Sequence, residues 1–106
     1  MWPTGAASAF AALGDETRLR LLAQLCDHGP QSIARLTAGM SVSRQAVTKH
    51  LQALQAAGLL RSARAGRQCI WELRPKRLAE VSRYIEDISA QWDAALARLR
   101  AMVEIR

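Results

Sequence analysis

The chain has 106 residues, enough for a single domain with a modest hydrophobic core. Half of the residues are apolar, which excludes a disordered chain, and the longest apolar runs are far short of the roughly 20 residues that cross a bilayer. The formal net charge is +6, and no basic region precedes an apolar stretch at the amino terminus, so we predict a cytoplasmic protein without a secretory signal.

The positive charge is concentrated in the middle of the chain. Between His28 and Leu78 the only acidic residue is Glu72, whereas the other eight acids lie outside this span. A basic centre between nearly neutral ends favours a polyanionic partner, and the alternative is a basic surface that is merely solvated. The basic residues of the span are Arg35, Arg44, Lys49, Arg61, Arg64, Arg67, Arg74, Lys76 and Arg77.

Two helices are predicted before this basic centre. The alanine-rich segment over residues 6–13 favours a helix that ends at Gly14. Asp15 is a suitable N-cap for a second helix, which Gly29 and Pro30 end. Apolar residues with the spacing i, i+3, i+4, i+7 predict a buried stripe on this second helix. The stripe consists of Leu19, Leu22, Ala23 and Cys26.

A pair of helices joined by a short turn is predicted over residues 32–57. Ser32 caps the first, short helix, and Gly39 ends it. Ser43 caps the second helix, and Gly58 follows its end at a position that favours a left-handed residue. The inner face of the second helix is predicted to consist of Val47, Leu51 and Leu54.

The opposite face of this second helix carries hydrogen-bonding side chains. Glutamine can pair with adenine, threonine offers a hydroxyl and a methyl group, and lysine or arginine can reach guanine or phosphate. We therefore predict a recognition helix for the major groove of double-stranded DNA, in which Arg44, Gln45 and Thr48 read bases while Lys49 and Gln52 have mixed roles. The alternative for Arg44 is a contact with a phosphate. The predicted DNA-binding residues of the helix are Ser43, Arg44, Gln45, Thr48, Lys49 and Gln52.

A β-hairpin, the wing, is predicted over residues 59–73. Residues 59–62 and 68–73 form its strands, and a basic connector over 63–67 joins them. Arg64 and Arg67 at its tip are expected to contact phosphates or the minor groove, although an ordinary exposed turn is the alternative. The five aromatic residues are not interleaved with basic ones as in single-strand binders, which favours double-stranded DNA.

The last helix is predicted over residues 75–104 and begins at a proline, which a first helical turn tolerates. Its apolar residues alternate by three and four positions over about three and a half heptads. So long a seam on a small domain predicts dimerisation with a second copy, and the alternative is packing within one chain. The seam residues are Leu78, Val81, Ile85, Ile88, Trp92, Ala95, Leu99 and Met102.

Catalysis and metal binding have little support in the sequence. There is no glycine-rich phosphate loop, no serine in a nucleophile-elbow setting and no His-Glu-x-x-His motif, so we predict no enzyme, no catalytic residue, no metal site and no cofactor. Cys26 and Cys69 are expected to be reduced, partly buried thiols, unless they meet in space and form a redox switch. His50 is interpreted as a hydrogen-bonded histidine at the core edge, the alternative being a metal ligand or phosphate contact.

Three segments carry a resemblance to a known family. They read Leu-Gly-Asp-Glu-Thr-Arg-Leu-Arg-Leu-Leu over 13–22, Ser-Arg-Gln-Ala-Val-Thr-Lys-His-Leu over 43–51 and Leu-Gln-Ala-Ala-Gly-Leu-Leu over 54–60. In this order and spacing they resemble the ArsR family of bacterial winged helix-turn-helix repressors. The resemblance implies an α-α-α-α-β-β-α homodimer, mainly helical with a small β-hairpin, whose first and last helices (6–13 and 75–104) form the interface. It also implies binding to an inverted-repeat operator and repression of transcription.

The sequence departs from the metal-sensing members of that family. Residues 31–36 lack the Cys-x-Cys motif, and no histidine follows His50, so the ligands of both common metal sites are missing. Residues 88–93 also resemble a metal-independent subgroup. In sulfur-reactive relatives a cysteine of the second helix pairs with one in the last helix, yet here Cys69 lies in the predicted hairpin.

We therefore predict that residues 1–106 form one winged helix DNA-binding domain. It would act as a homodimeric, sequence-specific repressor of an operator in double-stranded DNA, with no membrane contact and an effector that the sequence does not identify. One alternative is a repressor that senses redox state through Cys26 and Cys69. Another is a module that uses the winged fold and the heptad helix to bind a different protein.

Overall fold

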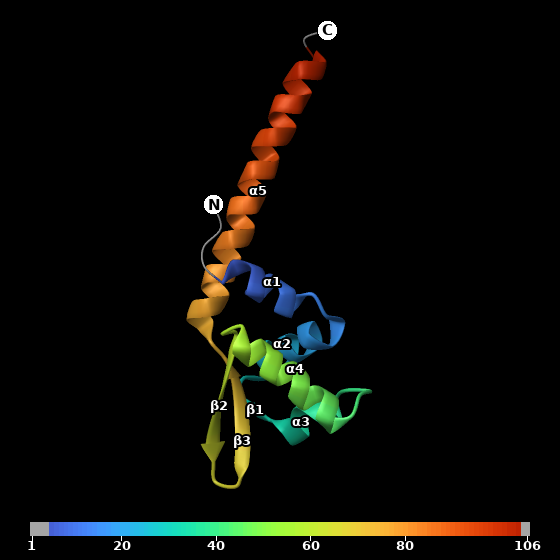
Figure 1. Ribbon diagram of the computed structural model, residues 1–106, viewed down its shortest axis with the longest axis vertical. Helices are drawn as coiled ribbons and strands as arrows, with labels where there is room; N and C mark the ends of the chain where they lie inside the picture. Colours follow the sequence, from blue (N-terminus) through green and yellow to red (C-terminus); the bar gives the residue numbers. More distant parts are fainter. Residues whose placement is uncertain (1–4, 105–106) are drawn as a thin grey trace.

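The protein is described by a computed structural model that covers residues 5–104. Its helices and strands follow the predicted winged helix-turn-helix order, with one additional short strand. The first four helices and the sheet gather in one body, and the last helix leads away from it (Figure 1). The elements are α1 (Ala6–Leu13), α2 (Glu16–His28), β1 (Gln31–Ser32), α3 (Ile33–Ala38), α4 (Arg44–Ala56), β2 (Leu60–Ala65), β3 (Gln68–Leu73) and α5 (Pro75–Glu104).

Side-chain caps set the starts of three helices, as the sequence predicted. The side chains of Asp15, Ser32 and Ser43 each accept a hydrogen bond from the backbone N–H three residues further on, at 3.1, 3.3 and 3.1 Å. Each cap satisfies a backbone donor that has no partner inside its helix. After α4, Gly58 adopts a φ of +81°, a conformation that costs glycine little, and the chain turns into the sheet.

The sheet has three antiparallel strands in the order β1-β3-β2, whereas the sequence predicted only the hairpin of β2 and β3. The missed strand β1 has two residues and pairs Gln31 with Trp71, so it is too short for an alternating pattern. The turn of the hairpin is also tighter than the predicted connector over 63–67. Ala65 already pairs with Gln68, which leaves a two-residue turn.

The core confirms the predicted inner face of α4 and corrects that of α2. Val47, Leu51 and Leu54 are fully buried. On α2, Leu21 and Leu25 are buried, whereas Leu19, Ala23 and Cys26 of the predicted stripe are exposed and Leu22 is only partly buried. Apolar residues occupy two faces of α2, so spacing alone was ambiguous. The hydrogen bond between Arg18 and α4 helps turn the face with Leu21 and Leu25 inward.

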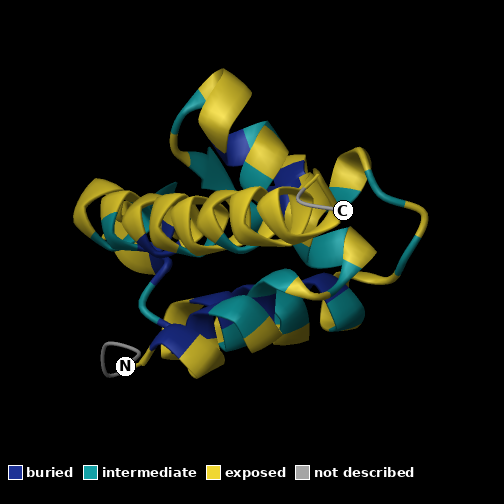
Figure 2. Ribbon diagram, turned by 90° about the horizontal axis from the view of Figure 1, so that it is seen from above, coloured by how far each residue is buried: buried dark blue, intermediate teal, exposed yellow. Residues whose placement is uncertain are grey.

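The predicted helix over 75–104 is confirmed as α5, but only its first turns pack on the body. Val81 and Tyr84 are buried there, and the Tyr84 ring lies 6.2 Å from that of Phe10 on α1, measured between ring centroids. Beyond them the helix is mostly exposed (Figure 2). The molecule is consequently elongated, 68 × 27 × 21 Å. Within residues 5–104 there is no helix with the length and apolar character to cross a membrane.

Candidate nucleic-acid interface

The outer face of α4 carries the hydrogen-bonding side chains that the sequence singled out. Gln45, Lys49 and Gln52 are exposed, while Thr48 is half-buried and Arg44 is exposed at the first helical position. The opposite face is buried in the core, and this packing fixes the position of the helix. Such a helix can enter a major groove without losing its packing.

Hydrogen bonds to the backbone limit the contacts that Ser43 and Thr48 can make with DNA. Ser43 Oγ accepts the bond from the N–H of Ala46 and therefore acts as the cap of α4. Thr48 Oγ1 donates to the carbonyl oxygen of Arg44 at 2.9 Å, which occupies its single hydroxyl hydrogen. Thr48 thus presents a methyl group and oxygen lone pairs, which suit a thymine methyl or an amino group of adenine or cytosine.

The wing presents two unpaired arginines at its tip. Gly66 opens the turn with a φ of +66°, and Arg67 follows it with a negative φ, the pattern of a two-residue type II′ turn. Arg64 and Arg67 are exposed and form no ion pair with any described residue. Arg61 differs, because it pairs with Glu72 directly across the strands.

A groove of about 420 Å³ lies between the wing and the starts of α3 and α4. It brings Arg44 of α4 together with Arg64 and Arg67 of the wing, a grouping that the sequence did not predict. Strand β1 joins α3 to the sheet and so brings this helix beside the wing. The groove is lined by Ser32, Ile33, Ala34, Arg44, Arg64, Arg67, Gln68 and Cys69.

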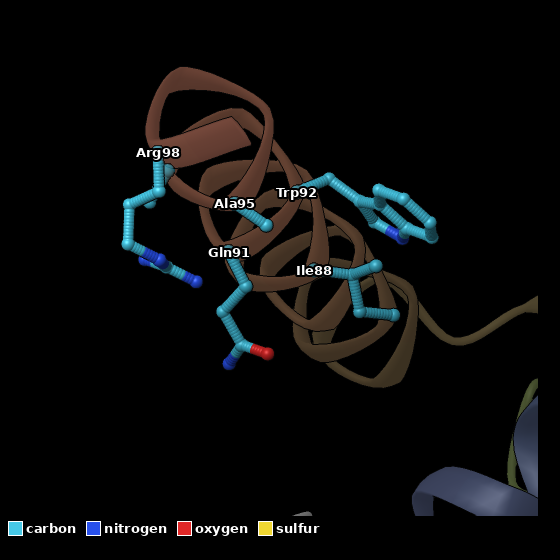
Figure 3. Close-up of a pocket in the computed structure, with 6 residues that line it drawn as sticks. Ile88, Gln91, Trp92, Ala95 and Arg98 are labelled. Carbon is cyan, nitrogen blue, oxygen red and sulfur yellow. The ribbon is translucent and has the colours of Figure 1, made fainter. Parts of the chain in front are cut away.

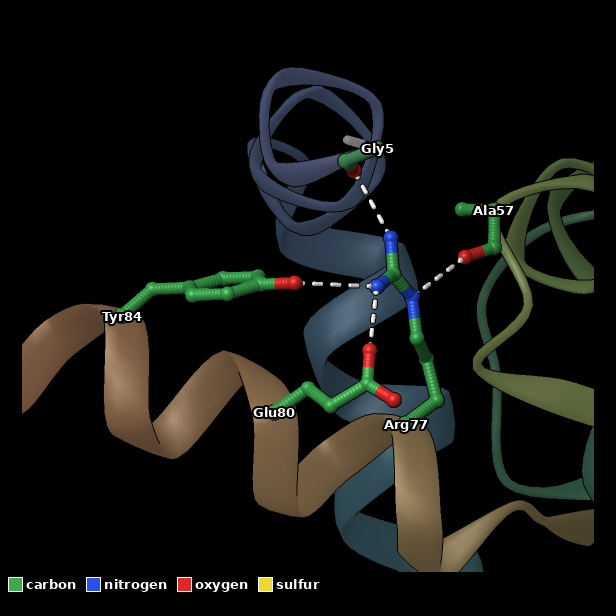
Figure 4. Close-up of polar contacts among 5 residues, drawn as sticks. All are labelled: Gly5, Ala57, Arg77, Glu80 and Tyr84. Carbon is green, nitrogen blue, oxygen red and sulfur yellow. Dashed lines mark hydrogen bonds and ion pairs between the residues drawn. The ribbon is translucent and has the colours of Figure 1, made fainter. Parts of the chain in front are cut away.

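The guanidinium of Arg77 forms hydrogen bonds within the fold and is not part of the exposed basic surface. Its guanidinium donates to Glu80 Oε2 at 2.7 Å, to Gly5 O at 2.8 Å, to Tyr84 Oη at 3.2 Å and to Ala57 O at 3.3 Å (Figure 4). The hydrogen bond from Arg77 lowers the pKa of Glu80 below its usual value, and the same bond raises the pKa of Arg77. These contacts join the starts of α1 and α5 to the end of α4.

His50 lies at the edge of the core, as interpreted from the sequence. Its Nδ1 accepts a hydrogen bond from Arg18 Nε at 3.1 Å and lies 3.8 Å from Asp15 Oδ2. The pKa of Asp15 is lowered, chiefly because its carboxylate accepts the backbone N–H of Arg18. The side chain of His50 thus ties the recognition helix to the start of α2.

The two cysteines lie on different elements and are both free thiols. Cys26 is exposed on α2, and Cys69 is half-buried on β3 where it lines the groove. Among residues 5–104, no three His, Cys, Asp or Glu side chains gather as a metal site would require. The redox alternative therefore stays a hypothesis without a bond in the structure to support it.

The outer part of α5 forms a second candidate surface, this one apolar. From Ile85 onward the helix leads away from the body, and most of its seam residues are exposed (Figure 1). Trp92, which projects from this part of the helix, is 63% exposed (Figure 3). Leu96 and Val103 widen the stripe, and the sequence interpretation missed them although each lies four residues after a seam position. Val81, by contrast, is buried in the core of its own chain.

Comparisons with known proteins agree with this geometry. The helix-turn-helix domain family matches residues 13–63. The HTH-type transcriptional regulator Rv2034 of Mycobacterium tuberculosis is 32% identical over 96 residues, which are 91% of this chain and 86% of that protein. The solved ArsR-like transcriptional regulator from Rhodococcus sp. RHA1 is 42% identical, with a TM-score of 0.77 and 92% of each chain covered.

A more distant structure shares the fold. It is the homodimeric winged helix-turn-helix DNA-binding domain Mb0332 from Mycobacterium bovis, described as a possible ArsR-family transcriptional regulator. The identity is 20%, the TM-score is 0.67, and the match covers 82% of this chain and 80% of that one.

Proposed function

We propose that this chain, which belongs to the ArsR family of winged helix-turn-helix transcriptional regulators, is a homodimeric repressor of an inverted-repeat operator. The regulators of this family are not enzymes. The observation that carries the proposal is the exposed polar face of α4 beside the unpaired arginines of the wing. We further assign it to the metal-independent subgroup, because residues 31–36 contain no thiol.

The proposed repression is steric. A dimer places two copies of α4 in successive major grooves about 34 Å apart, so that the bound protein blocks access of RNA polymerase. Gln45 and Thr48 would read base edges, while Lys49, Gln52 and the wing arginines would add contacts to bases or backbone. Double-stranded DNA in the cytoplasm is the expected partner.

The dimer would form through α5, with α1 beside it. Large apolar side chains in water are costly, and a second copy of the same helix would cover them along the whole seam. Support comes from the exposure of α5 beyond its first turns, which packing within one chain leaves uncovered. The partner-facing residues would be Ile85, Ile88, Trp92, Ala95, Leu99 and Met102, whereas Leu78 of the predicted seam packs against the core of its own chain.

A binding assay tests this function. Genomic fragments upstream of the protein's own gene are compared with random duplexes of equal length at physiological salt, by gel shift and by fluorescence anisotropy. We expect the operator fragment to bind at least about 10³-fold more tightly than random DNA. Equal affinity for all fragments would contradict sequence-specific repression.

Two variants separate the roles within the interface. Gln45→Ala with Thr48→Ala should reduce the preference for the operator, whereas Arg64→Ala should weaken binding to every duplex alike. Arg100→Ala, on the part of α5 that lies far from the wing, removes the same charge and should leave binding unchanged (Figure 1). Identical behaviour of the three variants would refute the assignment.

A further inference from the structure

The groove beside the wing is lined by positively charged side chains and by no acidic side chain. Arg44, Arg64 and Arg67 are its only charged lining residues, and no guanidinium group of the three forms an ion pair or hydrogen bond with a described residue. In contrast, three arginines elsewhere, Arg20, Arg61 and Arg77, are paired with carboxylates. Like charges in a concave site repel one another, so the groove favours an anion.

The other lining residues match the chemistry of a phosphodiester. The hydroxyl oxygen of Ser32 accepts the backbone N–H of Arg35, which leaves its hydrogen free to donate. Gln68 contributes a side-chain amide, and apolar atoms of Ile33, Ala34 and Cys69 complete the lining. Guanidinium groups bind phosphate oxygens in a planar, bidentate geometry.

The position of the groove indicates which molecule supplies the phosphate. Arg44 is the first residue of α4, directly before Gln45 on the face that would enter the major groove. With α4 in a major groove, a DNA strand that borders it would lie beside the start of α4 and the wing. Resting on the proposed function, we propose that this groove binds a backbone phosphate of DNA and that Arg44 is a phosphate ligand rather than a reader of bases.

If Arg44 binds a phosphate, replacing it should change the salt dependence of DNA binding by a predictable amount. Each phosphate that is neutralised contributes about −0.9 to the slope of log K against log salt. With one phosphate in the groove of each copy, a dimer would gain about two units of slope from its grooves, and loss of Arg44 from both copies would remove a large part of them. A residue that only hydrogen-bonds to a base leaves this slope almost unchanged.

The test compares Arg44→Gln, Arg44→Lys and Gln45→Ala by fluorescence anisotropy between about 50 and 300 mM salt. The probes are a random duplex and a duplex selected by the wild-type protein from a random library. We expect Arg44→Gln to weaken binding to both duplexes by the same factor and to lower the slope by about one to two units per dimer. Arg44→Lys keeps the charge and loses the bidentate geometry, so it should keep the slope and only part of the affinity, whereas Gln45→Ala should change only the preference.

The opposite pattern would overturn the assignment. A base-reading Arg44 predicts that both substitutions abolish the preference for the selected duplex and leave the slope unchanged. If Arg44→Gln weakens the binding of inorganic phosphate but leaves the affinity for both duplexes and the salt slope unchanged, the groove is a site for a free anion and the DNA assignment is wrong. If wild-type protein binds neither duplex, the proposed function itself fails, which is a distinct outcome.

The alkylation rates of the two cysteines provide an independent test of whether DNA occupies the groove. Cys69 lines the groove, whereas Cys26 is exposed on α2 and serves as the matched control. Saturating random duplex should slow maleimide alkylation of Cys69 several-fold and leave the rate at Cys26 unchanged, with Cys26→Ser and Cys69→Ser identifying each signal. An unchanged rate at Cys69 in the complex would contradict occupation of the groove by DNA.

Discussion

The body of the protein and the outer part of α5 use apolar side chains in opposite ways. In the body, Leu51, Leu54 and their neighbours on α1, α2, α3 and the sheet are closed off from solvent by one chain. Along α5, large residues such as Trp92, Leu99 and Met102 are more than half exposed. Both regions have helical apolar spacing, so periodicity alone does not tell which of them a single chain can bury.

The difference implies that folding and assembly are separable in this protein. The body encloses its own core, whereas the apolar surface of α5 would be covered by the proposed second copy. Substitutions in the body should therefore change the free energy of unfolding, and those on outer α5 should change the dimer dissociation constant.

The largest effect is expected from a cavity in the body. Leu51→Ala removes a fully buried side chain behind the recognition helix and should lower the free energy of unfolding by about 2–5 kcal/mol. Urea denaturation followed by circular dichroism measures the change. If the loss were below about 1 kcal/mol, the body would not depend on this core in the way described.

The next effect concerns assembly. Leu99→Glu places two charges in the proposed interface and should weaken the dimer at least about 100-fold, or about 2.7 kcal/mol. Ala97→Glu, two residues away and off the seam, is the control and should leave the constant within a few-fold. Sedimentation equilibrium measures both, and equal effects of the two variants would argue against the seam as the interface.

A smaller effect is expected at the junction of the two regions. Arg77→Met removes the hydrogen bonds that connect α5 to α1 and α4, and it leaves the Glu80 carboxylate without this partner. We expect the free energy of unfolding to fall by about 1–3 kcal/mol. Lys76→Met, an exposed neighbour, is the control, and a loss of similar size there would show that charge alone explains the result.

The smallest effect is a pH dependence at the same junction. The pKa of Glu80 is lowered in the folded state, so its ion pair stabilises the fold above the ordinary pKa of glutamate, and that stability is lost as pH falls through the folded value. The difference in Tm between wild type and Glu80→Gln should therefore be largest near neutral pH and shrink below about pH 4. A difference that stayed constant down to pH 3 would contradict this origin.

Much of the architecture was predictable because the signals act over a few residues. Asp15, Ser32 and Ser43 each cap a backbone N–H only three positions away, and Gly58 adopts its positive φ by its own local freedom. The limits of α1 and α5 and the buried face of α4 follow from such local rules. The side chains proposed to contact bases also lie on one face by helical geometry alone.

Features that depend on contacts between distant residues became known only from the folded structure. Contact with His50, 32 residues beyond Arg18, helps choose the buried face of α2, and a carbonyl 72 residues before Arg77 takes one of its hydrogen bonds. The pairing of Gln31 with Trp71 creates the third strand, and Arg44 meets Arg64 and Arg67 only after the wing has docked. Spacing within a segment carries no information about such pairings, because each requires two separate segments to meet.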